Sequence, residues 1–238
     1  MQRRSLDQPP HARLICSYGD LDVIRWSEPT VETNLDVDEQ LAQNAGQTGR
    51  RILRLWWGSN PTVVLGCGDK PEAALNVEEC ERRGIGWVRR VTGGGTVLQT
   101  HGVFNYSYTA PSHRRMDMRR AFERGAELIA GALAQFGVDA QQRGISDVAV
   151  GDLKISGNAQ ARKWGAVLLH GTVLVYVDYD LLEAVLKHPH REPDYRQGRS
   201  HRDFLTSLRD LGVNASFVEV EHAVADAARR LALEADDE

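Results

Sequence analysis

Residues 89–99 read RRVTGGGTVLQ and place two arginines directly before three consecutive glycines. Glycine loses the most conformational freedom on folding, so this run indicates a backbone that must reach positive φ or let a ligand approach closely. Successive N–H groups in such a turn form an anion site, and Arg89 and Arg90 supply the charge that a phosphate or carboxylate needs. A hairpin turn with two solvated arginines explains the same residues, so the stretch alone leaves both interpretations open.

A second group of polar residues follows at 146–147, 154–159 and 170–172. Taken singly, Lys154 is typical of a solvated strand edge, and His170 is typical of a buried histidine with a hydrogen-bonded ring. However, Ser156 and Gly157 place a small residue and a glycine next to the lysine, as expected where a backbone must give way to a ligand. The lysine ammonium is a compact point charge, so the expected ligand is an anion.

Local patterns predict the elements that must position these residues. The clearest is an amphipathic helix over 118–136, ended by Gly137. A helix is expected from Asn34 to about residue 41, followed by an exposed loop at 43–49. Two helices are expected to begin with capping boxes, one over 77–83 with Asn76 and Glu79, and the last one with Ser216 and Glu219. Further helices are expected over 178–187 and 200–211. Strands are expected at 13–18, 51–57, 62–66, 86–91, 96–99, 154–162 and 166–177, and at 104–109, whose alternation predicts a half-buried strand.

The order of these elements indicates the fold class. Strands cluster before and after the long helix instead of alternating with helices, which favours an α+β fold over a doubly wound parallel sheet. The 238 residues suffice for a substantial core and contain no linker. We therefore expect a single domain over 13–238, preceded by a disordered N-terminus at 1–12.

Composition narrows the partners and the compartment. The 29 Lys and Arg against 33 Asp and Glu give a formal net charge of −4, so no global basic field attracts nucleic acid or an anionic membrane. The longest apolar run, 164–177, is too short to span a bilayer, and no secretory signal is visible. Cys16, Cys67 and Cys80 are widely spaced and odd in number, which argues against a disulfide framework or a zinc site. A cytoplasmic protein is expected.

The motifs at 89–97, 154–159 and 170–172, in this order and at these separations, resemble the catalytic domain of lipoate–protein ligases, within the biotin and lipoate ligase superfamily. The resemblance extends from about Asn34 to Leu208. It implies a mixed, largely antiparallel sheet flanked by helices, as in class II synthetase-like catalytic domains. It also implies that the carboxylate of lipoate attacks the α-phosphate of ATP, and that a lysine of a lipoyl-carrier domain then takes the acyl group from the resulting lipoyl-AMP.

The resemblance also assigns roles to residues by position. Lys154 is expected to be the catalytic lysine that contacts the mixed anhydride, and Asp147 an acid near the nucleotide that acts through Mg²⁺. Both steps add negative charge to phosphoryl or acyl oxygens, so preorganised donors are the main requirement. The residues expected to bind substrate and adenylate are Arg90, Thr92, Gly93, Gly94, Gly95, Thr96, Gln99, Asp147, Ser156, Gly157, Ala159, His170, Gly171 and Thr172.

The sequence differs from the best-known form of the family at the acyl end of the pocket. That form continues from the glycines with a His-Asp pair where this chain has Gln99 and Thr100, and its following Asn is Val103 here. Octanoate therefore stands beside lipoate as a candidate substrate. Many ligases of the family also carry an accessory domain after the catalytic one, and this chain reaches Glu238 soon after its last expected helix. A separate accessory protein is therefore expected as a partner, besides the carrier.

Three other functions fit parts of the sequence. An octanoyl or lipoyl transferase of the same fold needs an activated cysteine thiolate, and no cysteine follows Cys80. Cys67 lies near the expected active-site loop, and a small buried residue is the favoured explanation for it. A biotin–protein ligase carries a different arginine-glycine signature, and a non-catalytic acyl-binding or carrier-binding domain would not need Lys154, Arg90 and the glycines together. ATP-dependent adenylation is therefore the preferred hypothesis.

Overall fold

The computed structural model describes residues 12–58, 60–112 and 117–236. Their largest element is a mixed sheet of eight strands, in which β2 and β3 are parallel and all other neighbours are antiparallel. The expectation of disorder at 1–12 falls outside the described residues, apart from Ala12. In spatial order the strands are β1 (Arg13–Tyr18), β2 (Leu21–Arg25), β3 (Arg51–Trp57), β7 (Val103–Pro111), β11 (Ala166–Leu174), β10 (Leu153–Lys163), β9 (Asp147–Val150) and β8 (Gln141–Arg143).

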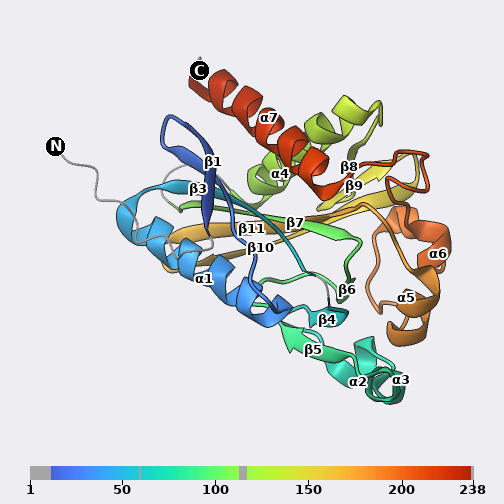
Figure 1. Ribbon diagram of the computed structural model, residues 1–238. Coiled ribbons are helices and arrows are strands. Elements are labelled where there is room, and N and C mark those ends of the chain that lie inside the picture. The colour runs from blue at the N-terminus through green and yellow to red at the C-terminus, as the bar shows by residue number, and fades with distance from the viewer. Residues whose placement is uncertain (1–11, 59, 113–116, 237–238) are drawn as a thin grey trace.

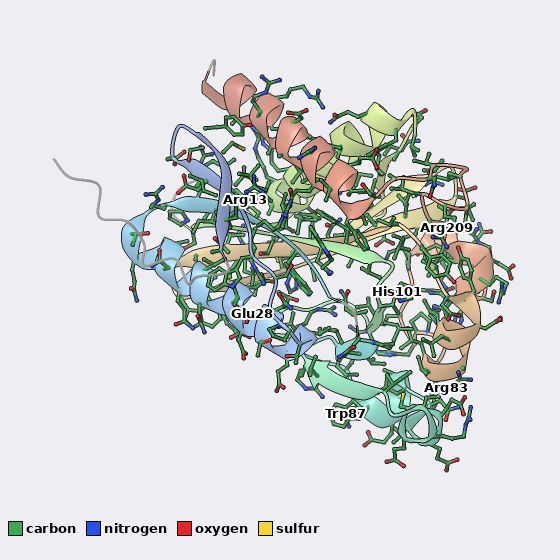
Figure 2. The ribbon with its side chains drawn as sticks, viewed as in Figure 1. Arg13, Glu28, Arg83, Trp87, His101 and Arg209 are labelled. Carbon is green, nitrogen blue, oxygen red and sulfur yellow. The ribbon has the colours of Figure 1, made fainter. Side chains whose placement is uncertain are left out.

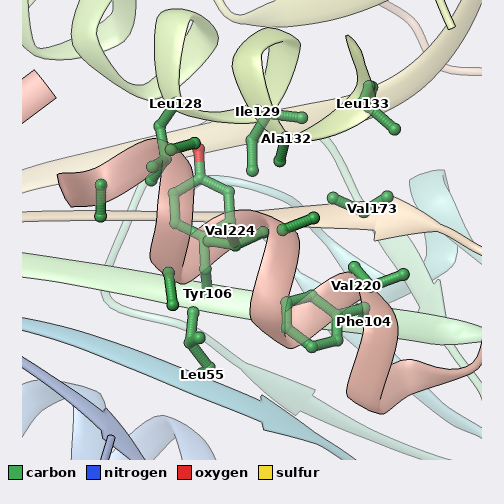
Figure 3. Packing of buried hydrophobic residues seen from close by; sticks show 14 of the residues in the cluster. Leu55, Phe104, Tyr106, Leu128, Ile129, Ala132, Leu133, Val173, Val220 and Val224 are labelled. Atoms are coloured by element: carbon green, nitrogen blue, oxygen red, sulfur yellow. The ribbon is translucent and has the colours of Figure 1, made fainter. Parts of the chain in front are cut away.

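Helices cover both faces of this sheet (Figure 1). Helix α1 (Val31–Thr48) packs on one face, whereas α4 (Met118–Leu133), continued by a 3₁₀ turn at Ala134–Phe136, and α7 (Phe217–Asp236) pack on the other face and against each other. The largest apolar cluster lies on this second face, where each fully buried Leu, Val or Phe contributes about 1.5–3 kcal/mol. Figure 3 shows side chains of that cluster, including Phe104, Tyr106, Ile129, Leu133, Val220 and Val224.

A second sheet of three strands lies beside the α1 face, in the order β5 (Gly86–Arg89), β4 (Thr62–Leu65) and β6 (Val97–Gln99). It has its own apolar cluster, shared with short helices on its outer side. Arg83 and Trp87, labelled in Figure 2, lie in this outer part of the molecule, and Trp87 is exposed. The short elements are α2 (Pro71–Ala74), α3 (Val77–Arg83), α5 (Tyr179–Val185), a 3₁₀ turn at Asp194–Arg196 and α6 (His201–Phe204).

The α+β prediction and the largely antiparallel sheet are confirmed, as are several local predictions. The long helix ends in a 3₁₀ turn whose cap, Gly137, has φ 74°. Asn76 caps α3 by accepting from the Glu79 N–H, and Gly84 closes that helix with φ 66°. Ser216 and Glu219 bond each other reciprocally at the start of α7, as the capping box requires. In the described part of the chain, no helix combines the length and apolarity needed to cross a membrane.

Three predictions about elements are wrong. Helix α1 does not end at residue 41: its cap is Thr30, it continues to Thr48, and Gly49 closes it. The polar composition of 43–49 is misleading because Ala45 packs against the large sheet while the polar side chains face outward. The β7 strand is buried on both faces and not half-buried, because α1 covers the face that its alternate residues present. Strands β2, β8 and β9 were not predicted, and the 200–211 helix is limited to His201–Phe204.

Two glycines within helices provide a matched test of this packing. A Cβ on Gly46 of α1 would lie 2.0 Å from the carbonyl oxygen of Trp164, whereas a Cβ on Gly131 of α4 would meet Ala227 at an ordinary 3.6 Å. Gly46→Ala should therefore lower the free energy of unfolding by about 1–3 kcal/mol despite the better helix propensity of alanine. Gly131→Ala should raise it by up to about 1 kcal/mol. Urea unfolding of both variants checks this, and stabilisation by both would contradict the close approach of α1.

Candidate functional site

The glycine loop, residues 92–96, lies against the chain segment that follows β4. The backbone N–H of Cys67 donates to the carbonyl of Thr92 at 2.9 Å. A Cβ on Gly66 would lie 2.0 Å from the carbonyl oxygen of Gly94, and Gly94 itself has φ 81°. Both glycines are therefore required by the backbone, one for close approach and one for a left-handed conformation. The Thr96 hydroxyl donates to Asp69 at 2.7 Å and ties the far end of the loop to the same segment.

Arg90 is 7% exposed, so the interpretation with two solvated arginines is wrong. Its guanidinium donates to the carbonyls of Gly93 at 2.6 Å and Gly95 at 2.7 Å, and to the Thr92 hydroxyl at 2.9 Å. Burial lowers the pKa of Arg90 to about 10, which leaves it cationic at neutral pH. Arg89 likewise donates to backbone carbonyls, of Gly66 and Asp69 among others. Arg90 shapes the glycine loop and Arg89 binds the segment beside it, and contact of Arg90 with an adenylate stays a prediction.

A continuous chain of polar contacts connects this loop to the large sheet. The Thr92 hydroxyl lies 2.7 Å from His170 Nε2, and His170 Nδ1 lies 3.2 Å from Asp38 Oδ2. Arginine Nε–H can only donate, so Thr92 accepts from Arg90. With a neutral His170, Thr92 then donates to Nε2 and Nδ1–H donates to Asp38, so each group in the chain has a partner.

The far end of this chain is the ion pair of Asp38 and Arg54, which are 1% and 0% exposed. The Arg54 guanidinium donates to Asp38 Oδ1 at 2.6 Å and to the carbonyls of Trp26 and Asn34 at 2.8 Å. Burial alone would raise the pKa of Asp38, but Arg54, then His170 and the Ser107 hydroxyl, outweigh it and hold that pKa below its ordinary value. Burial lowers the pKa of Arg54. Asp38 is thus an ionised carboxylate that accepts three hydrogen bonds.

Lys154 lies on β10, the strand whose Ala159 approaches the glycine loop. Its Nζ lies 2.8 Å from Asp147 Oδ1, and the Tyr195 hydroxyl donates to Asp147 Oδ2 at 3.0 Å. Burial, and then the Asp147 carboxylate, raise the pKa of Tyr195. A Cβ on Gly157 would lie 2.7 Å from the Lys154 ammonium, so the glycine makes room for the lysine side chain. That the backbone here gives way to a ligand stays a prediction. The backbone carbonyl of Lys154 accepts from Thr206 N–H at 2.9 Å.

Strand register decides which predicted residues share this face. Ala159 faces the glycine loop, since a Cβ on Gly94 would lie 3.8 Å from that of Ala159, and Gly157 and Lys154 share this face of the strand. A β-bulge follows Lys154 and places Ser156 opposite Val148, a residue of the α4-side core. The Ser156 side chain is therefore directed away from Lys154. Its hydroxyl is buried and has no hydrogen-bond partner among the described residues.

Gln99 is buried and Thr172 is half-buried next to this site, whereas Gly171 faces the opposite side of the large sheet. Gln99 exchanges hydrogen bonds with Asn105 at 2.7 and 3.2 Å, and Thr172 is paired with Asn105 in register. Gly171 belongs to the α4 face, where a Cβ would lie 2.1 Å from Asn158 Oδ1 and 2.8 Å from the Tyr106 ring. Gly171 is therefore needed for packing behind the site, and its side of the strand does not face Lys154.

Four residues of the site were not assigned roles from the sequence: Asp38, Arg54, Asn105 and Tyr195. A signal existed for Arg54, because a charged residue within the apolar run RILRLWW must find a partner when the strand is buried. Nothing in the sequence indicated that Tyr195 would reach Asp147 across 48 residues. Cys67 is exposed, so its prediction as a small buried residue is wrong.

Magnesium binding can be tested against the donors present. Among the described residues, no three His, Cys, Asp or Glu side chains are grouped so that they could hold a metal ion. Mg²⁺ in phosphate chemistry usually takes one or two carboxylates plus phosphate oxygens, so Asp147 alone suits that role. However, Lys154 and Tyr195 engage both of its oxygens. Ligation by Asp147 stays a prediction and requires exchange of one of these contacts.

Comparisons with known proteins place most of the chain in one family. The family model for the lipoyl protein ligase A/B catalytic domain matches residues 30–229. Lipoate-protein ligase A subunit 1 of Thermoplasma acidophilum is 30% identical over 201 residues, which cover 80% of this chain and 76% of that protein. Octanoyltransferase LipM of Kyrpidia tusciae is 30% identical over 220 residues, which cover 81% and 80%. The match spans only about half the length of several other lipoate ligase relatives.

Solved structures agree with these matches. A bipartite lipoate protein ligase from Thermoplasma acidophilum, described together with its E2 lipoyl domain, superposes with a TM-score of 0.78 at 28% identity and covers 91% of this chain and 84% of that one. A putative lipoate protein ligase from the same organism with bound lipoic acid gives 0.75 at 26%, covering 89% and 85%. A lipoate-protein ligase A bound with ATP gives 0.77 at 28%, covering 89% and 85%.

The buried ion pair gives a prediction about stability and its pH dependence. Asp38→Asn leaves the Arg54 charge buried without its counter-ion and should lower the free energy of unfolding at neutral pH by about 3–5 kcal/mol. The folded pKa of Asp38 lies below its unfolded value of about 3.9, so its stabilisation is complete above about pH 4 and is lost as pH falls through the folded pKa. The wild type should therefore lose more stability on acidification than the variant.

Urea unfolding from about pH 7 to about pH 3 measures this difference. Asp36→Asn is the matched control, because Asp36 lies on the exposed face of the same helix. It should change stability by less than about 0.5 kcal/mol. Similar losses in the two variants would show that the ion pair does not stabilise the fold.

Proposed function

The chain belongs to the lipoyl protein ligase A/B catalytic-domain family, and we propose that it activates lipoate or octanoate with ATP and transfers the acyl group to a lysine of a carrier domain. The observation that carries this proposal is the Lys154 ammonium, held by Asp147 at 2.8 Å on the strand face that looks toward the glycine loop. A cation on a strand that packs against a preorganised loop suits both steps, because each one adds negative charge to oxygen atoms.

The proposed reaction has two balanced steps. A carboxylate oxygen of the acid bonds to the α-phosphorus of ATP, and the bond from that phosphorus to the β-phosphate bridging oxygen breaks, so pyrophosphate leaves. A neutral lysine amine of the carrier then bonds to the acyl carbon, AMP leaves with the electrons of the C–O bond, and the nitrogen loses a proton to give an amide. Lys154 donates hydrogen bonds to phosphoryl and acyl oxygens and forms no covalent bond. In the absence of substrate, Asp147 satisfies the same ammonium.

Solved structures similar to this chain support the proposal, because two of them contain ligands of the proposed reaction. One structural neighbour is a ligase bound with ATP and another holds lipoic acid. The Thermoplasma neighbour is a bipartite ligase studied with an E2 lipoyl domain. We propose that the present chain likewise uses ATP as a substrate and a lipoyl-carrier domain as the acceptor, and that a separate accessory protein is a further partner. Residues 13–238 then act as one catalytic domain.

A second candidate function is acyl transfer through a cysteine thioester, without ATP. It is favoured by the octanoyltransferase relative and by Cys67, an exposed thiol whose backbone N–H is bonded to the glycine loop. Against it, Cys67 precedes the glycine loop and no cysteine follows residue 80 in the sequence. ATP-dependent adenylation gives Lys154, Asp147 and Arg90 a shared role in binding the acyl-adenylate, so we rank this function first.

Replacing Lys154 tests the proposed site. Lys154→Met removes one preorganised donor and should lower the rate of acyl transfer to a lipoyl-carrier domain about 10²–10³-fold, while the thermal midpoint changes little. Both half-reactions should be followed, acyl-AMP formation from lipoate and ATP, and transfer from supplied lipoyl-AMP. Lys163→Met is the matched control, since Lys163 is exposed at the end of the same strand. Near-normal turnover by Lys154→Met would refute the assignment.

Replacing Cys67 separates the two candidate functions. Under the adenylation proposal, Cys67→Ser changes one exposed loop atom, so activity should stay within about threefold of wild type and should still require ATP. Under the thioester alternative, the same variant loses all turnover and the wild type carries an acyl group on Cys67. Mass spectrometry of the intact protein after incubation with lipoate and ATP, or with an octanoyl thioester, distinguishes these results.

A further inference from the structure

A cavity of about 260 Å³ lies on the face of the large sheet that α4 and α7 cover, away from Lys154. Its sheet wall is formed by β2, β3, β7 and β11, and its roof by the two helices. In Figure 3, Tyr106 extends from β7 toward α4 near Leu128, and both residues line the cavity. The cavity therefore shares the sheet with the catalytic site but opens on the other side of it.

The interior of the cavity is apolar. Its buried lining residues include Leu21, Leu53, Leu128, Leu169, Ala228 and Ala232. The two hydroxyl groups in its wall have other partners: Tyr106 donates to Asn158, and Tyr108 is bonded to Arg51. A buried water needs two to four polar partners, which the leucine and alanine side chains of the interior do not offer, so an apolar chain is the better occupant of that part.

The opening of the cavity is cationic. Arg51 is paired with Asp20, and the nearest carboxylate oxygen to Arg124 is that of Glu127, 3.7 Å from its Nη1. Arg120 is exposed, and its side chain forms no ion pair within the described residues. Among the side chains that the structure describes at the rim, the three guanidinium groups are thus paired with two carboxylates, those of Asp20 and Glu127. A ligand that fits an apolar interior below this rim has an apolar body and one terminal anionic group, and a carboxylate suits arginine best.

The volume limits the length of such a ligand. An apolar protein cavity of about 150 Å³ holds benzene, so the same ratio gives roughly ten non-hydrogen atoms for the present cavity. A straight chain of eight to ten carbons is of this size. We propose that this cavity is a second ligand site, which binds a free medium-chain monocarboxylic acid with its chain among the leucines and its carboxylate at Arg120 and Arg124. This proposal is independent of the proposed ligase activity.

The site is tested with decanoic acid that carries an alkyl diazirine, photolysed on the 238-residue protein and followed by peptide mass spectrometry. We expect labelling within 124–128 of α4 or 228–232 of α7. Calorimetry with hexanoate, octanoate and decanoate should show binding about fourfold tighter for each added methylene. Longer acids should give no further gain, because the cavity is then full. Decanol should bind more weakly than decanoate.

Variants complete the test. Arg120→Gln should weaken binding of decanoate about two- to fivefold, while Arg119→Gln, an exposed neighbour on the same helix that does not line the cavity, should leave it unchanged. Ala228→Phe should abolish labelling by filling the cavity, and its thermal midpoint shows whether it folds. Lys154→Met should bind the probe normally, which separates this site from the ligase site. Labelling confined to the glycine loop and β10, or labelling unaffected by both Arg120→Gln and folded Ala228→Phe, would overturn the proposal.

Discussion

Arg54 and Asp38 carry opposite charges in a place that water does not reach, and much of the site depends on how these charges are satisfied. Removing two ions from water costs several kcal/mol each unless nearly every donor and acceptor on them is used. Arg54 meets this requirement with Asp38 and with carbonyls around the start of α1, and Asp38 uses its second oxygen for His170. His170 in turn reaches Thr92, so α1, β3, β11 and the glycine loop are held in one relative arrangement.

The large sheet separates an apolar core on one face from the polar candidate site on the other. Residues of β7 that face α4 and α7, such as Phe104 and Tyr106, build the apolar core, whereas Asn105 and Ser107 face the polar chain. This separation follows from the pleat of the strand, because successive side chains point to opposite faces of the sheet. The bulge after Lys154 adjusts the same alternation, because it directs the ammonium and Gly157 to the polar face while Ser156 joins the apolar side.

Much of the fold could be predicted from the sequence, because helix caps and strand patterns are local, and the motifs indicated two of the segments that meet at the candidate site. Gly137 and the Ser216–Glu219 box ended or began helices as their neighbours indicated. The family motifs identified the glycine loop and Lys154, which the structure brings to one face. The failures are non-local: the extent of α1 depends on its contact with β11, and the direction of Ser156 depends on a bulge set by pairing with β9. Arg90 is turned into its own loop by carbonyls whose positions no motif specifies.

The side chain and the backbone of Lys154 have separate roles. The ammonium belongs to the polar site, while the carbonyl accepts the Thr206 N–H and so joins β10 to the segment that carries Tyr195. A chimaera that takes the 192–206 segment from a relative but keeps its own β10 would shift the strand that presents the lysine. In protein engineering, therefore, the strand and this segment form one exchangeable module, and loop grafting within the family has to respect its boundaries.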